Sequence, residues 1–218
     1  MSADLTLYSN PMSRGRIARW MMEEIGQPYR VEMLDYGTAM KSAAYLAINP
    51  MGKVPCLVHG ETVVTETAAI CAYMADTFPD AGLAPTAAER GAYYRWLFFF
   101  AGPVEQAVTN KAMKFDVPAD KKQMAGYGSY DETVETMERR LSETPYIAGD
   151  RFTAADVYIG AQIGWGLQFG TIPTRPVFGE YAARVMDRSA WRRATELDDA
   201  MMPTMTPDMG TPDMGEGT

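Results

Sequence analysis

In the first part of the chain, apolar residues recur with two different spacings, one typical of strands and one typical of helices. Apolar and polar side chains alternate over residues 5–8 and again over residues 29–33, which is the pattern of a half-buried strand. Between them, the apolar residues of 17–25 share one helical face, and Gly26 suits the left-handed residue that ends a helix. A strand, a helix and a second strand in this succession predict a βαβ unit with parallel strands.

A hairpin and another helix are expected after the βαβ unit. Residues 42–47 predict a short helix, and residues 54–58 and 62–65 predict two antiparallel strands joined by a turn at Gly60. The apolar residues of 70–78 then return to helical spacing. Together these elements predict an α/β domain.

The rest of the chain carries helical patterns only. Helices are expected from Thr86, bent or ended at Gly102-Pro103, and over 131–142, 153–167 and 189–200. The expected organisation is an α/β domain at residues 1–79, a Pro- and Gly-containing linker at 80–85, an all-α helical bundle domain at 86–202 and a tail at 203–218. The tail repeats Thr-Pro-Asp-Met-Gly without periodic apolar residues, which predicts disorder.

The clearest local signal in the second half is the segment Phe152–Val157. Thr153 can cap a helix, and Asp156 can return the hydrogen bond from the third helical position. Phe152 can pack on Val157 as a hydrophobic staple. A structural role is sufficient for this motif, which is expected to start a buried helix.

Charge and composition exclude several classes of function. The 218 residues carry a net charge of −8, which disfavours binding to nucleic acid. No apolar run approaches the ~20 residues that a membrane helix needs, and no leader pattern occurs, so we expect a cytoplasmic protein that does not bind membranes. The single histidine, His59, excludes a multi-histidine metal site, and we expect no metal. Cys56 and Cys71 are expected to be buried rather than reactive.

Two neighbouring segments predict a ligand site. Pro55 has no amide hydrogen and pushes Val54 toward an extended conformation, so the Val54 backbone can pair with an outside peptide. Glu66 and Thr67 open the next helix, where free amide hydrogens and the positive end of the dipole favour a carboxylate. The expected ligand is a short peptide with an acidic end.

These features, in this order, resemble the cytosolic glutathione S-transferases, and in particular a serine-type bacterial branch. The resemblance rests on the βαβ unit and hairpin with Gly-Lys-Val-Pro at 52–55, the helix start at Glu66-Thr67, the linker, and the helical half with Phe152–Val157. It covers nearly the whole chain. It implies a thioredoxin-like first domain that binds glutathione as a co-substrate, a helical second domain that lines a pocket for a hydrophobic electrophilic small molecule, and a homodimer.

The same resemblance implies roles for individual residues of the ligand site. Val54 should offer its backbone to the cysteinyl unit of glutathione, next to a cis proline at Pro55. Glu66 and Thr67 should hold the γ-glutamyl end. Lys53 adjoins Val54 and could attract the negatively charged tripeptide, or it could be a solvated loop lysine.

The implied chemistry needs a thiolate, and a free cysteine thiol of pKa about 8.5 is only slightly ionised at neutral pH. Ser13 precedes the first long helix and resembles the serine of the serine-type branches, although a plain helix cap would also explain it. Asn10 is a second candidate donor. Tyr8 resembles the tyrosine of other branches, and Ser9 lies on the same loop. The sequence leaves the choice among these four residues open.

Three functions remain possible at this stage. The first is a glutathione transferase that adds the thiolate to an electrophile. The second is a glutathione-dependent thiol-disulfide oxidoreductase or peroxidase, which a cysteine at the helix start would favour and Ser13 does not. The third is a non-catalytic interaction module with the same fold, which would be expected to lose the glutathione site.

Residues of the electrophile pocket are less well defined. Arg14 and Arg16 could add positive potential near the thiolate.

The candidates for pocket walls are large apolar residues of the helical half: Trp96, Phe98, Phe99, Phe100, Met113, Phe115, Trp165 and Phe169. Their periodicity does not choose among them.

Overall fold

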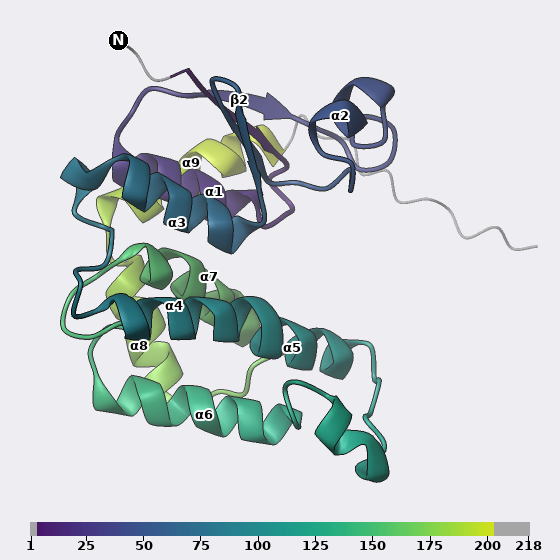
Figure 1. Ribbon diagram of the computed structural model, residues 1–218, viewed down its shortest axis with the longest axis vertical. Coiled ribbons are helices and arrows are strands. Elements are labelled where there is room, and N and C mark those ends of the chain that lie inside the picture. The colour runs from purple at the N-terminus through teal and green to yellow at the C-terminus, as the bar shows by residue number, and fades with distance from the viewer. Residues whose placement is uncertain (1–3, 203–218) are drawn as a thin grey trace, which may run out of the picture.

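The structure is a computed structural model that describes residues 4–202, and its first half is built on one mixed sheet (Figure 1). The strands are β1 (Leu5–Ser9), β2 (Arg30–Met33), β3 (Cys56–His59) and β4 (Thr62–Thr65). Their order is β2-β1-β3-β4, with β1 parallel to β2 and the other pairs antiparallel. The predicted βαβ unit and hairpin are therefore confirmed. The strand expected from Val54 begins only at Cys56, because Pro55 has no amide hydrogen to give to a ladder.

Helices α1 (Gly15–Ile25) and α3 (Thr67–Thr77) pack together against the sheet, with α2 (Ala43–Ile48) set apart from them (Figure 1). The apolar face of α1 is fully buried, and Gly26 ends the helix with a positive φ of 69° as expected. Trp20 on this face contacts the rings of Phe152 and Trp191, which belong to the helical half. The two halves of the chain thus share one core.

Between the linker and residue 202, the long elements are all helices. They are α4 (Arg90–Phe99), α5 (Glu105–Ala112), α6 (Tyr130–Glu143), α7 (Ala154–Gln168), α8 (Pro176–Met186) and α9 (Ser189–Met201). Short 3-10 turns occupy Pro79–Ala81 and Ala119–Met124. The buried α7 packs against α1, α3, α4 and α8, while α9 returns to pack against α1 (Figure 1). The chain has the expected α/β N-terminal half with a helical C-terminal half.

The first helix of the bundle is irregular at Gly102-Pro103, where the sequence predicts a bend or an end. Thr86 and Glu89 exchange the two hydrogen bonds of a capping box, at 2.8 and 3.3 Å, although regular α-helix begins only at Arg90. Pro103 lies in a π-helical turn, Phe100–Val104, that joins α4 to α5 without ending the helix.

Asp156 is the central polar residue of the bundle. Its carboxylate accepts hydrogen bonds from the Thr153 amide and hydroxyl, both at 2.9 Å, which confirms the predicted capping box. It also accepts from the Ile147 amide and the Tyr181 hydroxyl, both at 2.8 Å, and it is fully buried. One carboxylate therefore holds the start of α7, the preceding loop and α8 together.

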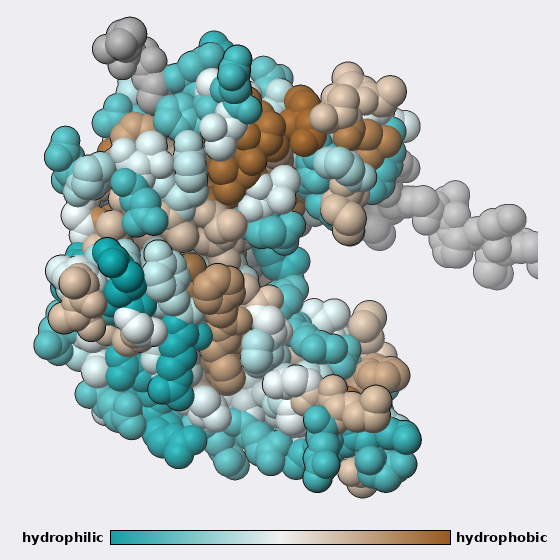
Figure 2. All heavy atoms as spheres, viewed as in Figure 1, coloured by the Kyte–Doolittle hydropathy of each residue, from teal (hydrophilic) through white to brown (hydrophobic). Residues whose placement is uncertain are grey.

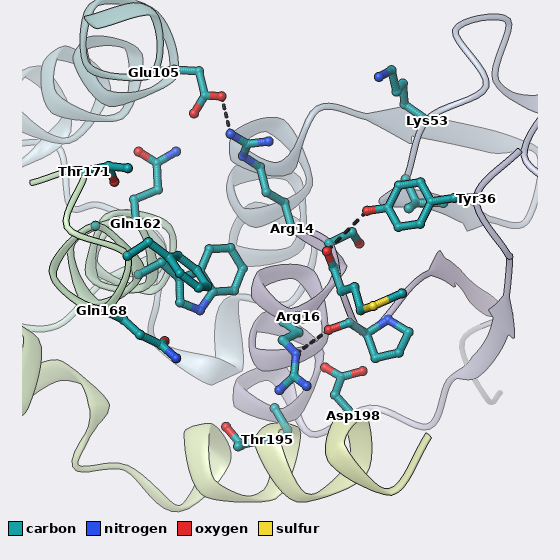
Figure 3. A pocket seen from close by; sticks show the side chains of 18 of the residues that line it. Arg14, Arg16, Tyr36, Lys53, Glu105, Gln162, Gln168, Thr171, Thr195 and Asp198 are labelled. Atoms are coloured by element: carbon teal, nitrogen blue, oxygen red, sulfur yellow. Dashed lines mark hydrogen bonds and ion pairs between the residues drawn. The ribbon is translucent and has the colours of Figure 1, made fainter. Parts of the chain in front are cut away.

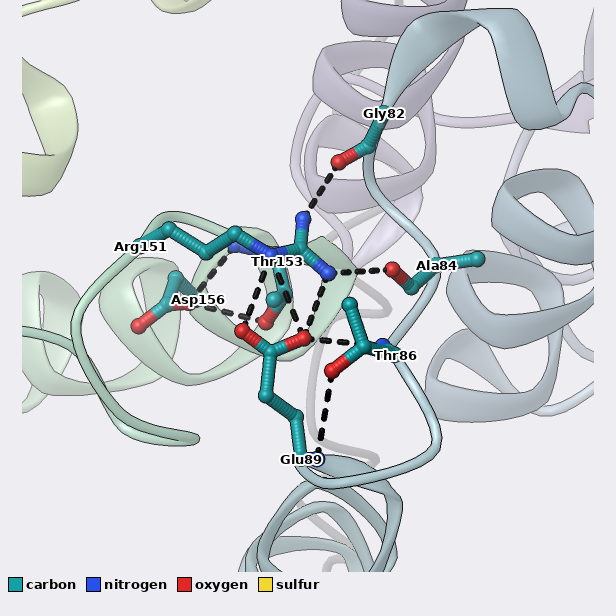
Figure 4. Close-up of polar contacts among 7 residues, drawn as sticks. All are labelled: Gly82, Ala84, Thr86, Glu89, Arg151, Thr153 and Asp156. Atoms are coloured by element: carbon teal, nitrogen blue, oxygen red, sulfur yellow. Dashed lines mark hydrogen bonds and ion pairs between the residues drawn. The ribbon is translucent and has the colours of Figure 1, made fainter.

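A second polar cluster fixes the linker to the helical half (Figure 4). The Arg151 guanidinium donates to the carbonyls of Gly82 and Ala84, at 2.6 and 2.5 Å, and pairs with the Glu89 carboxylate at 2.6 Å. The hydrogen bond from Arg151 is the main reason that the pKa of Glu89 falls to about 2. The linker is therefore held to the helical half through two of its carbonyl groups.

Two helices differ from the sequence-based expectation, and the predicted tail cannot be compared with the structure. Helix α8 is absent from the prediction, although Phe178, Tyr181 and Val185 share its buried face. Ser189, expected to be a helix cap, is the first residue of α9 and makes no capping hydrogen bond. The tail expected at 203–218 lies outside the described residues. Among residues 4–202, no helix is both long and apolar enough to cross a membrane.

Candidate functional site

A cavity of about 930 Å³ separates the start of α1 from the helical half (Figure 3). Its first wall consists of residues 11–14, the loop after β2 and the loop before β3. Its second wall consists of the start of α5, the C-terminal part of α7, residues 171–172 and one face of α9. Elements that are far apart in the sequence therefore meet at one site.

Ser13 is the one residue among the four candidate thiol donors that lines this cavity. Its hydroxyl donates to the Asn10 carbonyl at 2.7 Å and accepts from the Gly15 amide at 2.9 Å, so it also caps α1. Gly15 is required here, because a Cβ at this position would lie 2.0 Å from the Ser9 hydroxyl. Both the catalytic and the capping interpretation of Ser13 are thus compatible with its position.

The structure does not bring Asn10, Ser9 or Tyr8 into the cavity. Asn10 is fully buried, and its side-chain amide donates to the Leu34 carbonyl at 2.8 Å and accepts from the Met12 amide at 2.9 Å. The expectation that Asn10 donates to a thiol is corrected, because its side chain holds the loop instead. Ser9 is buried beneath the helix start. Tyr8 packs on Tyr45, with ring centroids 5.4 Å apart.

One backbone amide at the start of α1 is free. Within residues 12–17, every amide donates a hydrogen bond except that of Arg14. This N–H group is adjacent to Ser13, at the positive end of the helix dipole. The helix start therefore offers one amide donor beside one hydroxyl.

The loop before β3 is held in position by buried polar contacts. The Lys53 carbonyl accepts from the Tyr45 hydroxyl at 2.6 Å and from the Asn49 side chain at 2.8 Å. Val54 and Lys53 both line the cavity, and the Val54–Pro55 peptide bond is cis, as the resemblance implied. The Val54 backbone is thus fixed at the edge of the cavity, next to the sheet.

Gly52 and Lys41 support this loop. Gly52 has a φ of 57°, and a Cβ there would lie 2.6 Å from the Met40 carbonyl, so only glycine fits. The Lys41 ammonium donates to the Met51 carbonyl at 2.9 Å. Lys41 and Lys53 line the cavity, and neither forms an ion pair with another described residue. This end of the cavity therefore carries uncompensated positive charge.

Glu66 and Thr67 lie next to this loop rather than in the wall of the cavity. Thr65 pairs with Cys56 across the β3–β4 hairpin, which puts the start of α3 beside Pro55. Glu66 is an exposed non-glycine residue with a φ of 64°, a backbone conformation that costs about 1–3 kcal/mol and is found mostly at functional sites. Thr67 is buried.

The sequence analysis missed Tyr36, a polar residue that lines the cavity. Tyr36 follows β2 and donates to the Met12 carbonyl at 3.3 Å beside Ser13 (Figure 3). Burial raises the pKa of its phenol, an effect that Ser13 and Arg14 oppose. Tyr36 lies in a loop with no periodicity or motif, so only its aromatic character could have drawn attention to it.

The two arginines at the start of α1 are neutralised by the helical half. Arg14 pairs with Glu105 at the start of α5, across the cavity (Figure 3). Arg16 donates to the Pro11 carbonyl at 2.5 Å and pairs with Asp199 of α9 at 2.7 Å. The predicted positive potential of these arginines is therefore largely compensated. Lys41 and Lys53 are the cavity-lining cations that form no ion pair within residues 4–202.

Apolar side chains line the second wall. Among the candidates, Trp165 and Phe169 face the cavity together with Val104, Val108 and Ile172. The remaining candidates do not: Trp96 and Phe100 are buried in the core, Phe99 packs against it, and Phe98, Met113 and Phe115 are exposed elsewhere. The wall formed by α5 and α7 is thus suited to an apolar, aromatic ligand.

Neither cysteine of the chain can act as a nucleophile from its position. Cys56 and Cys71 are fully buried, and neither lines the cavity. Burial raises the pKa of Cys56 to about 11 and that of Cys71 further. Within residues 4–202, no group of three or more His, Cys, Asp or Glu side chains is arranged to hold a metal ion.

Comparison with known proteins matches both halves of the chain. The family model of the glutathione S-transferase N-terminal domain matches residues 12–77, and that of the C-terminal domain matches residues 105–165. Glutathione S-transferase 3 from Zea mays is 30% identical over 166 residues, which are 71% of this chain and 74% of that protein.

Solved structures agree with these matches. A glutathione transferase from Methylococcus capsulatus superposes with a TM-score of 0.74 at 28% identity, over 90% of this chain and 99% of that one. A sphingomonad glutathione S-transferase complexed with glutathione superposes with a TM-score of 0.71 at 26% identity, over 89% and 98% of the two chains.

Proposed function

The chain belongs to the glutathione S-transferase family, and we propose that it binds glutathione as co-substrate and adds the glutathione sulfur to an apolar electrophile. The observation that carries the proposal is one cavity with two unlike walls. The first has a hydroxyl and a free amide at a helix start beside the fixed Val54 backbone. The second carries the apolar side chains of Val104, Val108, Trp165, Phe169 and Ile172.

Val54 serves as the peptide-binding residue in this proposal. Its backbone is held at the cavity edge by the contacts of Lys53 with Tyr45 and Asn49, so the cysteinyl unit of glutathione can pair with it without loop reordering. The ammonium groups of Lys41 and Lys53, which form no ion pair with another described residue, supply charge opposite to that of the tripeptide.

The γ-glutamyl end of glutathione is assigned to Glu66 and Thr67, beside Pro55. The first amides of α3 suit its carboxylate, and the Glu66 carboxylate suits its ammonium group. Support comes from the positive φ of Glu66, a conformation that folding alone does not favour. The pairing of Thr65 with Cys56 places this end beside the loop that carries Val54.

Ser13 and the Arg14 amide stabilise the thiolate in this proposal. On binding, the thiol loses its proton to solvent, and the Ser13 hydroxyl turns from the Asn10 carbonyl to donate to the sulfur. A hydrogen bond to a charged group contributes about 1.5–3 kcal/mol, which corresponds to a pKa decrease of about one to two units. Thiol exchange through a protein cysteine is not favoured, because Cys56 and Cys71 are buried.

We further propose that the protein is a homodimer. Figure 2 shows apolar atoms gathered over the β3–β4 hairpin and along α4 on one face of the molecule. The exposed large apolar residues of these elements are Val63, Tyr94 and Phe98, and the side chains of Tyr94 and Phe98 are in contact. An exposed apolar patch of this kind is typical of an interaction surface.

Two assays test the proposed function. The protein should be retained on immobilised glutathione and released by free glutathione, and it should conjugate glutathione to chlorodinitrobenzene. Failure to bind would contradict both enzymatic functions and favour an interaction module. Binding without conjugation would contradict the transferase and favour glutathione-dependent reduction of peroxides or disulfides.

A further inference from the structure

Ser9, the last residue of β1, carries a buried hydroxyl without a hydrogen-bond partner. The residue has no exposed surface, and its Oγ atom forms no hydrogen bond with any described residue. The main chain of Ser9 is fixed, because the residue pairs with Met33 of β2 and its carbonyl accepts from the Leu34 amide at 2.9 Å. A buried hydroxyl of this kind lowers the stability of the folded protein, so folding alone does not explain it.

The Ser9 hydroxyl lies against the start of α1, close to Ser13. A Cβ atom at Gly15 would lie 2.0 Å from the Ser9 Oγ atom and 2.9 Å from the Ser13 Oγ atom. The two hydroxyl oxygens therefore border the same small space, which the missing side chain of Gly15 leaves between them and the helix. Ser13 is the residue on the cavity side of this space, since it lines the cavity and Ser9 does not.

The Ser13 oxygen can accept one more hydrogen bond. A hydroxyl has one hydrogen and two lone pairs. The Ser13 hydrogen goes to the Asn10 carbonyl at 2.7 Å, and one lone pair accepts from the Gly15 amide at 2.9 Å. The neighbouring Tyr36 hydroxyl gives its own hydrogen to a loop carbonyl at 3.3 Å (Figure 3). Among the described residues, Ser9 is therefore the hydroxyl beside Ser13 whose hydrogen is unused.

We propose that Ser9 is a positioning residue for the glutathione thiolate, and that its hydroxyl donates to the Ser13 oxygen in the glutathione complex. The proposal rests on the proposed transferase function and deepens it. When the Ser13 hydrogen turns from the Asn10 carbonyl to the sulfur, the Ser13 oxygen keeps its bond from the Gly15 amide and accepts the Ser9 hydrogen as well. Ser9 acts only through Ser13, since it does not line the cavity.

Two hydroxyl groups in a chain stabilise the thiolate more than one hydroxyl does. Each hydrogen bond in a chain polarises the next, so a Ser13 hydroxyl that accepts from Ser9 becomes a stronger donor to the sulfur. Ser9 keeps its proton throughout, and the thiol proton still leaves to solvent. The Ser9 hydroxyl thus costs stability in the free protein and contributes only in the complex.

The variant Ser9→Ala separates these two effects. Without glutathione, it should unfold at the same urea concentration as the wild type or at a slightly higher one, because no hydrogen bond is lost. With glutathione bound, the thiol pKa, measured from the thiolate absorbance, should rise by roughly half a unit. Conjugation of chlorodinitrobenzene at saturating glutathione, at a pH below the thiol pKa of both proteins, should fall about threefold.

Two controls accompany this measurement. In a Ser13→Ala background, Ser9→Ala should not change the thiol pKa further, because Ser9 no longer has a route to the sulfur. Tyr93→Phe also removes a buried hydroxyl without a hydrogen bond, but Tyr93 lies on α4 and does not line the cavity. This variant should change neither the thiol pKa nor the conjugation rate.

Three results would overturn the role of Ser9 while leaving the transferase intact. The first is an unchanged thiol pKa in a Ser9→Ala variant that binds glutathione. The second is an equal increase in the Ser13→Ala background, and the third is a clear fall in the urea midpoint of the free protein, which would show a structural hydrogen bond. If the wild-type protein does not bind glutathione, the proposed function itself fails.

Discussion

Replacing Ser13 by alanine is the most informative perturbation of the proposed site. The change removes the one hydroxyl among the four candidates that lines the cavity, and leaves the free Arg14 amide in place. Loss of a hydrogen bond of about 1.5–3 kcal/mol to the thiolate should raise the pKa of the bound glutathione thiol by about one to two units. At a pH near the wild-type thiol pKa, the thiolate fraction would then fall about five- to fiftyfold.

The assay is a pH titration of the thiolate absorbance of bound glutathione, together with kcat/KM across the same pH range. The proposed role of Ser13 lowers the thiol pKa in the wild type, so activity should be present above that pKa and lost below it. In Ser13→Ala the profile should move to higher pH, and activity should recover well above the new pKa. Ser13→Thr keeps a hydroxyl and should retain most of the shift.

A matched control separates capping from catalysis. Ser129 caps α6 by accepting a hydrogen bond from the Glu132 amide at 3.3 Å, and it does not line the cavity. Ser129→Ala should lower stability by about 1 kcal/mol, as Ser13→Ala should through its lost contact with the Gly15 amide, but without any change in thiol pKa. An unchanged thiol pKa in a Ser13→Ala variant that still binds glutathione would refute the proposed role of Ser13.

Three further predictions concern the fold and the assembly. Asp156→Ala leaves buried donors without an acceptor and should lower the free energy of unfolding in urea by about 3–5 kcal/mol; a loss below about 1 kcal/mol would contradict the central role of this carboxylate. The Arg151 hydrogen bond lowers the pKa of Glu89 from 4.5 to about 2. The Glu89–Arg151 pair should therefore contribute fully to stability above pH 4.5, and this contribution should be lost as the pH falls toward 2. In Glu89→Gln, the thermal midpoint should be lower at neutral pH and should vary less over that acidic range, whereas an unchanged acid profile would argue against the pair with Arg151. Phe98→Asp places a charge on the exposed patch and should convert a dimer to a monomer by light scattering, without loss of helicity; a dimer that persists would place the interface elsewhere.

Local sequence patterns predicted the fold well because the periodicity and capping residues of most elements agree with the secondary structure that these elements adopt. The periodicity of α1, the Gly26 cap and the Thr153–Asp156 capping box all appear in the structure where the sequence indicates them. The long helix from Thr86 was only partly right, since a π-helical turn at Pro103 depends on how α4 and α5 pack. Helix α8 was missed although its apolar residues recur at helical spacing, and Gly179 within it weakens the helical signal.

The site was harder to predict because it is assembled from distant segments. The Val54 loop was predicted from Pro55 and its neighbours, the cis Val54–Pro55 bond followed from the family resemblance, and Ser13 was one of four open choices. The pair between Arg14 and Glu105 spans 91 positions and has no sequence signature.

A crystal structure of the protein with bound glutathione tests the central claim most directly. The account predicts that the tripeptide pairs with the Val54 backbone, beside the first wall of the cavity, and that its sulfur lies within about 3.5 Å of the Ser13 hydroxyl oxygen. A sulfur atom closer to Tyr36 or to another donor, with Ser13 still bound to the Asn10 carbonyl, would contradict it.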